Sequence, residues 1–267
     1  MLVSRKAYFV DVPKSASTYV YQALRKVVDQ SYDDGVPSAW TTNKRHPVQS
    51  THGMLHDDRH GRLLGYNEEE FADKLVYVAT RDPVEYYLSI FHYEREGQGP
   101  IKKPLGLEPD YENKFDWWTH AVIDNRRPLA DYEGPRYKNR PQGLGLCTFR
   151  FLDNVDERFF AQGPRTWEEV EQWYDEHYWN PDCPMEMLGP HNIGADFADL
   201  LLRHEDKFKL KPDWKDHIPE FHNNILQRPR ISRKGRESVL SYYPGIAEVI
   251  KKAERIIYQG LDFTSKW

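Results

Sequence analysis

The chain has 267 residues and a balanced charge, with 37 Lys and Arg against 42 Asp and Glu, a formal net charge of -5. This balance argues against a nucleic-acid partner, because proteins that bind nucleic acids usually carry a basic excess. Aromatic residues make up 14% of the chain, which excludes wholesale disorder, and the lack of a long apolar run or a secretory leader predicts a soluble, cytoplasmic protein with no membrane partner.

The first predicted element is a short buried strand over Ala7 to Val12, followed by a turn of small and polar residues from Pro13 to Thr18. Ser17 or Thr18 can cap a helix that starts in this turn. Apolar residues then recur at helical spacing, at Val20, Ala23, Leu24, Val27 and Val28. The first 30 residues therefore predict a strand, a turn and a helix.

The same order of elements recurs further along the chain. Leu75 to Thr80 form a continuous β-rich run, which suits a central parallel strand. After Arg81, Asp82 can cap a helix with Pro83 at its first position, and Glu85 completes an acidic variant of the capping box. An apolar stripe follows at Val84, Tyr87, Leu88 and Phe91. Two such strand–turn–helix units predict an α/β fold.

Four further helices are predicted along the rest of the chain. The second of them has a capping signature, Thr166 with Glu169 three residues later. The four cover Trp117 to Ile123, Thr166 to Tyr178, Ala195 to Leu202 and Ser238 to Gly260. Because no internal repeat or low-complexity linker occurs, we expect a single domain over residues 1–267, with long polar insertions around 32–67 and 96–145.

The turn after the first strand has the features of a phosphate-binding cradle. A turn between a buried strand and a helix directs several backbone N–H groups at one point, where the helix dipole adds positive potential. Lys14 adds a full charge, and hydroxyl donors follow at Ser15, Ser17 and Thr18. The segment is not a Walker A loop, because it contains no glycine. Taken alone, it is explained equally well as an ordinary connection with a solvated lysine.

Arg81 and Ser89 indicate a second anion-binding segment. Arg81 ends the second strand, and Ser89 lies eight residues later, about two helical turns into the predicted helix. Arginine is suited to bidentate phosphate recognition, and a serine hydroxyl can complete the same shell. Since the ligands of parallel α/β sheets lie at the carboxyl ends of the strands, we expect Lys14 and Arg81 at that edge.

Together these two segments resemble the donor-binding motifs of sulfotransferases. Residues 13–19, PKSASTY, resemble the family's 5′-phosphosulfate-binding loop, and residues 81–89, RDPVEYYLS, resemble its 3′-phosphate-binding segment. The second run is most similar to carbohydrate-type members, in which an alanine often stands where Ala16 stands here. Tyr19 matches the position at which cytosolic members have a tryptophan that meets the adenine. The resemblance covers the first third of the chain.

The resemblance implies a P-loop-like three-layer fold, with a central parallel sheet flanked by helices. It also implies that 3′-phosphoadenosine-5′-phosphosulfate (PAPS) is the donor, that 3′,5′-ADP is the product, and that no metal is required. Lys14 would bind the bridging oxygen and offset charge on the leaving phosphate. Further donors would come from Ser15, Ser17 and Thr18, while Arg81 and Ser89 would hold the 3′-phosphate.

A third segment, Arg233, Lys234 and Gly235, resembles the loop that closes on the 3′-phosphate in cytosolic sulfotransferases, at a similar distance from the C-terminus. Carbohydrate-type members often lack this loop. A basic surface linker before the last helix explains the same three residues equally well.

The acceptor hydroxyl must lose a proton as it attacks sulfur, and a histidine or a glutamate with a raised pKa can accept it. In the sulfotransferase superfamily a histidine often follows the second strand, and His52, in the run STHG, is the best match. His56 is the second candidate, and an acidic residue remains the third. His52, His56 and His60 do not predict a metal site, because the neighbouring glycines argue against the helix that would align them.

These observations favour a sulfotransferase that acts on a hydroxyl of a small molecule or glycan, with a carbohydrate preferred. Two alternatives stay open, a nucleotide-dependent kinase of the P-loop type and a non-catalytic relative that binds a nucleotide or a glycan. Independence from Mg²⁺ would separate the first hypothesis from the kinase. Aromatic residues could stack on a sugar, although core packing explains them as well: Trp117, Trp118, Trp173, Tyr178 and Trp179.

Overall fold

The computed structural model describes residues 2–3, 7–10, 12, 17–28, 49–50, 53–54, 75–95, 115–124, 136–177, 185–189, 192–208, 210–222 and 245–258. The chain divides into two compact units. The sheet unit comprises Met1–Arg81, Asn154–Glu157 and Pro184–Pro229, and the helical unit comprises Asp82–Asp153, Arg158–Cys183 and Arg230–Trp267. The single domain expected over 1–267 stays a prediction, because much of both expected insertions lies outside the described residues.

The sheet unit is built on four strands in the order β1-β2-β5-β6, which are Leu2–Val3, Ala7–Val10, Leu75–Ala79 and Met185–Leu188. Strands β2, β5 and β6 run parallel, and β1 pairs with β2 antiparallel. A separate antiparallel pair consists of β3, Gln49–Ser50, and β4, Gly53–Met54. The two parallel strands predicted from the sequence are therefore neighbours, and the prediction of a mixed α/β fold with a parallel sheet is confirmed.

The central strand β5 shows why the pattern of apolar residues specifies this sheet. All five of its residues are buried, as expected for a parallel strand with neighbours on both sides and both faces covered. Successive side chains of a strand alternate between the two faces of the sheet. Phe9 and Tyr77 belong to the core cluster on one face. Their neighbours along the strands, Val10, Val76 and Val78, are fully buried as well.

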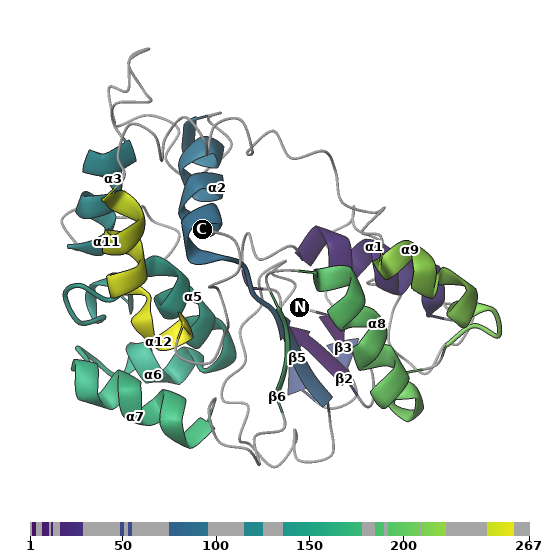
Figure 1. The fold of residues 1–267 in the computed structure, drawn as a ribbon. Helices are drawn as coiled ribbons and strands as arrows, with labels where there is room; N and C mark the ends of the chain where they lie inside the picture. The colour runs from purple at the N-terminus through teal and green to yellow at the C-terminus, as the bar shows by residue number, and fades with distance from the viewer. Residues whose placement is uncertain are drawn as a thin grey trace. The chain divides into compact units, whose positions relative to one another are not determined.

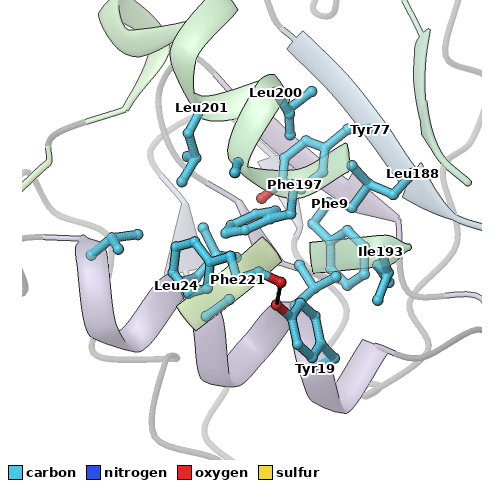
Figure 2. Close-up of a cluster of buried hydrophobic side chains, with 14 of the residues drawn as sticks. Phe9, Tyr19, Leu24, Tyr77, Leu188, Ile193, Phe197, Leu200, Leu201 and Phe221 are labelled. Carbon is cyan, nitrogen blue, oxygen red and sulfur yellow. Dashed lines mark hydrogen bonds between the residues drawn. The ribbon is translucent and has the colours of Figure 1, made fainter. Parts of the chain in front are cut away.

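Three helices cover the face of the sheet that carries Phe9 and Tyr77: α1, α8 and α9 (Figure 1). They span Ser17–Val27, Ile193–Arg203 and Ile218–His222. Figure 2 shows their apolar side chains packed against those of the strands, among them Leu24, Phe197 and Phe221. Two 3₁₀ helices, η3 (Glu205–Lys207) and η4 (Trp214–His217), link α8 to α9. This packing holds α1 against the sheet.

The helical unit consists of helices packed around aromatic side chains. Its helices are α2 (Pro83–Arg95), α3 (Phe115–Ile123), α5 (Leu146–Val155), α6 (Glu157–Ala161), α7 (Trp167–His177), α11 (Ile246–Ala253) and α12 (Arg255–Tyr258), with the adjoining ends of α5 and α6 grouped in the sheet unit. Phe91 and Trp118 pack with ring centroids 5.4 Å apart, and Phe115 lies 5.0 Å from Phe91. These contacts join α2 to α3.

The predicted caps of α2 and α7 are confirmed. The side chain of Asp82 accepts a hydrogen bond of 2.9 Å from the backbone N–H of Glu85, and Pro83 is the first residue of α2. Thr166 and Glu169 cap α7 reciprocally, because each side chain accepts from the other's backbone N–H, at 3.3 and 2.8 Å. The helix predicted over Ser238 to Gly260 is corrected within its described part, where it breaks at Glu254 into α11 and α12.

Candidate functional site

The carboxyl edge of the sheet is the place where the predicted donor-binding segments begin. Strands β2 and β5 are parallel neighbours, with Val10 paired to Val78. The link from β2 to α1 and the residues after β5 therefore leave the sheet at the same edge. In α/β folds this edge, with the N-termini of the following helices, is where anionic ligands bind.

The described residues include only part of the predicted site. Ser17 and Thr18 are the first two residues of α1, so their backbone lies at the helix N-terminus, inside the helix and not at the capping position predicted for one of them. His52 lies between β3 and β4 in the chain. Eight predicted site residues lie outside the described residues: Lys14, Ser15, Ala16, His52, His56, Arg233, Lys234 and Gly235.

Arg81 follows β5 at a point that the sheet holds firmly. The backbone N–H and the hydroxyl of Thr80, its predecessor, both donate to the carbonyl of Leu188, at 2.9 and 3.0 Å. Thr80 is buried, whereas Arg81 is partly exposed. The end of β5 is thus tied to β6, and the Arg81 side chain extends from backbone that is held at the carboxyl edge.

Ser89 lies in α2, in the helical unit, at a partly exposed position. Tyr86 lies three residues earlier, so the two side chains share one face of the helix. The Tyr86 ring is fully buried, and Arg150 on α5 donates a hydrogen bond of 3.3 Å to its hydroxyl. The Arg150 guanidinium group therefore contacts Tyr86, which lies on the side of α2 that carries Ser89.

Tyr19 belongs to the core of the sheet unit. Its side chain is 4% exposed, and its hydroxyl donates to the carbonyl of Phe221 at 3.4 Å, as Figure 2 shows. Burial, and then the nearby charge of Glu220, raise the pKa of Tyr19 to about 12. This placement gives Tyr19 a packing role and adds no support to the predicted contact with adenine. It also ties the end of α9 to the first turn of α1.

The third parallel strand, β6, and the start of α8 extend the same edge and were not assigned to the site from the sequence. The side chain of Asn192 caps α8 by accepting from Ala195 N–H at 3.2 Å. The Asp196 carboxylate accepts from the Gly189 N–H at 2.8 Å, which fixes the turn after β6. The sequence signal for β6 was short, because only the four residues Met185 to Leu188 precede Gly and Pro.

A buried carboxylate, Glu254, organises the helical unit and was also missed. It is fully buried and accepts hydrogen bonds from the N–H of Cys147 (2.8 Å) and from the N–H and hydroxyl of Thr148 (2.7 and 2.6 Å). Burial raises the pKa of Glu254, and the hydrogen bonds from Thr148 and Cys147 act against that rise. The available signal was a glutamate flanked by Ala253, Ile256 and Ile257 in an apolar helix stripe.

Of the candidate acceptor-side aromatics, Trp117 on α3 is 55% exposed, whereas Trp118 and Trp173 are buried. On the same helix, His120 Nε2 lies 3.6 Å from Asp116 Oδ1. Trp118 and Trp173 therefore serve as core residues, as the alternative explanation had it. Tyr178 and Trp179 lie outside the described residues.

Within the described ranges, His, Cys, Asp and Glu side chains nowhere form a group of three that could hold a metal ion. In the same part of the chain, no helix has the length and apolar character needed to span a membrane. No protein-family model matches the chain, and neither the search of curated proteins nor that of solved structures finds a match.

Proposed function

We propose that the protein is a sulfotransferase of P-loop-like fold that transfers a sulfuryl group from PAPS to a hydroxyl group, with a carbohydrate as the preferred acceptor. One observation carries the proposal. The strands that precede the two motif segments, 13–19 and 81–89, are parallel neighbours whose carboxyl ends lie at one edge of the sheet. A donor with phosphate groups at both its 5′ and 3′ positions requires two such segments at a common edge.

In the proposed complex, the N-terminus of α1 and Lys14 hold the 5′-phosphosulfate, and Arg81 with Ser89 holds the 3′-phosphate. The geometry of α1 supports the first part, because the helix has 11 residues and no acidic residue in its first turn to oppose an anion. The anchoring of Thr80 supports the second, because it fixes the backbone from which the Arg81 side chain extends. Arg233, Lys234 and Gly235 are proposed as a further contact to the 3′-phosphate.

The residues of the chain would divide the chemistry between them. As the acceptor oxygen bonds to sulfur, the bond from sulfur to the 5′-phosphate oxygen breaks, and 3′,5′-ADP leaves. Lys14 would offset the negative charge that grows on that leaving oxygen. His52 would accept the proton of the acceptor hydroxyl, with His56 or an acidic residue as the alternative base. Positioning and electrostatics would supply most of the rate enhancement.

Calorimetry with 3′,5′-ADP, 5′-AMP and ATP tests the proposal, with and without Mg²⁺. We expect 3′,5′-ADP to bind far more tightly than 5′-AMP, because the latter leaves Arg81 and Ser89 without a phosphate. Arg81→Ala should reduce this preference by about 10- to 100-fold, the scale of a lost charge-assisted hydrogen bond. Arg158→Ala, a change of an exposed arginine on α6, is the matched control.

Equal affinities for 3′,5′-ADP and 5′-AMP in the unchanged protein would refute the assignment of the donor. Tighter binding of ATP that depends on Mg²⁺ would favour the kinase alternative instead. A preference for 3′,5′-ADP without sulfuryl transfer to any hydroxyl acceptor would favour the non-catalytic alternative.

A further inference from the structure

The N-terminus of α5 is capped by a side chain from the far end of the chain. The first turn of a helix has backbone N–H groups without partners inside the helix. In α5 the Glu254 carboxylate accepts hydrogen bonds from the backbone N–H groups of Cys147 and Thr148 and from the Thr148 hydroxyl. Gly145 immediately precedes α5, and its N–H donates to the carbonyl of Ala253 at 2.9 Å. The junction of α11 and α12 is thus hydrogen-bonded to the start of α5 through both its main chain, at Ala253, and its side chain, at Glu254.

Tyr87 connects this cap to α2. The Tyr87 hydroxyl accepts a hydrogen bond of 2.8 Å from the N–H of Leu146, the first residue of α5, whose next two N–H groups bind Glu254. The Tyr87 ring is fully buried, and α11 packs against α2. The Leu146 N–H therefore links the capped start of α5 to the buried side of α2.

Ser89 lies two residues beyond Tyr87 on α2. Two residues correspond to a rotation of about 200° around a helix, so Tyr87 and Ser89 lie on nearly opposite sides of α2. This agrees with their exposure, since Tyr87 is fully buried and Ser89 is partly exposed. Any shift or rotation of α2 that follows the loss of the Tyr87 anchor therefore moves the Ser89 hydroxyl.

A second set of buried hydrogen bonds holds the loop before α5. Arg140, also buried, donates to the carbonyls of Leu144 and Val122 and to the Tyr137 hydroxyl at 2.6 Å. These contacts fix the loop before α5 independently of Glu254. The link from this loop to α2 runs through the Tyr87 hydroxyl.

We propose that Glu254 is a positioning residue for donor binding: by capping α5, whose first N–H group holds the Tyr87 hydroxyl, it sets the position of α2 and of the Ser89 hydroxyl that binds the 3′-phosphate. This inference rests on the proposed function. Its distinctive consequence is that loss of the Glu254 carboxylate weakens recognition of the 3′-phosphate, in addition to any loss of stability.

The test compares the affinities for 3′,5′-ADP and 5′-AMP, by calorimetry on the full chain, in Glu254→Gln, Tyr87→Phe and the double variant. A glutamine keeps one acceptor oxygen but presents its NH₂ group to the remaining donors, so part of the cap is lost with little change in volume. We expect each single change to reduce the preference for 3′,5′-ADP by about 3- to 30-fold, the range over which residues that couple sites act. The double change should cost no more than the larger single change, because both disrupt one network.

Glu248→Gln is the control, because Glu248 lies on α11 with a side chain 74% exposed and pairs only locally, with Lys251 at 2.9 Å. It should leave the preference unchanged. Tyr87→Phe keeps the buried ring and serves as the test if Glu254→Gln does not fold. A lower melting temperature with an unchanged preference in the folded variants would overturn the inference and leave the proposed function standing. An unchanged protein with no preference for 3′,5′-ADP would overturn both.

Discussion

Gly145 is the residue whose substitution most directly tests the structure of the helical unit. It is buried, and a Cβ atom placed on it would overlap the Glu254 carboxylate. Gly145→Ala therefore requires the carboxylate to move away from α5, which removes its hydrogen bonds to Cys147 and Thr148. The alternative, a shift of the backbone at 145, would break the bond from its N–H to Ala253.

The expected cost follows from these contacts. Forcing an extra methyl group into a packed interior costs about 1–3 kcal/mol. A hydrogen bond to a charged group contributes about 1.5–3 kcal/mol to stability. Part of this contribution is kept, because the groups around the substituted residue relax. We expect Gly145→Ala to lower the free energy of unfolding by about 3 kcal/mol, which in a chain of this size lowers the melting temperature by roughly 6–12 °C.

Differential scanning calorimetry on the full chain measures this shift, and the chain supplies a matched control. Gly245 has a right-handed helical backbone, and a Cβ atom there would meet no atom within 4 Å. Gly245→Ala should leave the melting temperature unchanged or raise it slightly, since alanine reduces the entropy of the unfolded chain. Equal melting temperatures for the two variants would refute the placement of the Glu254 carboxylate against Gly145.

Three further outcomes are expected. Although partial burial raises the pKa of Glu186, hydrogen bonds from Arg203 and the adjacent imidazole lower it on balance. The stability lost in Glu186→Gln, about 1 kcal/mol or less by urea unfolding at pH 7, should therefore disappear as the pH falls through this lowered pKa. Lys14→Ala should reduce turnover more than PAPS affinity, with poor rescue by Lys14→Arg; near-normal activity in either variant would show that the turn is only a connection. If His52 is the base, activity should rise with pH through a pKa near 6.5, and His52→Ala should lose about 100-fold or more while His56→Ala does not.

Local signals were sufficient for the elements that carry their own caps. Helix α2 was predicted because Asp82 and Pro83 precede its apolar stripe, and α7 because Thr166 and Glu169 form a capping box. In both cases every group that stabilises the helix start lies within four residues in the chain. Strand β5 was predicted for a similar reason, since its burial on both faces requires an uninterrupted apolar run.

Helix α5 was missed because its cap is not local. Its residues, LCTFRFLDNV, follow Gly145 with no serine, threonine, aspartate or asparagine in the capping position. The group that satisfies its first N–H groups is Glu254, 106 residues from Thr148. Strand β6 was missed for a different reason, because three of its four residues are only partly buried and leave little apolar pattern to recognise.

The same distinction between local signals and distant contacts applies to the candidate donor site. The sequence predicts which residues bear the chemistry, because Lys14 and Arg81 each follow a strand directly and a parallel sheet brings such positions to one edge. It cannot predict what holds Ser89 in place, because α2 is anchored through Tyr87 to the start of α5, which Glu254 caps. If donor recognition depends on these contacts, substitutions far from both motifs along the chain will alter it. The precision of the 3′-phosphate site is then a property of the packed helical unit, and the segment RDPVEYYLS alone does not determine it.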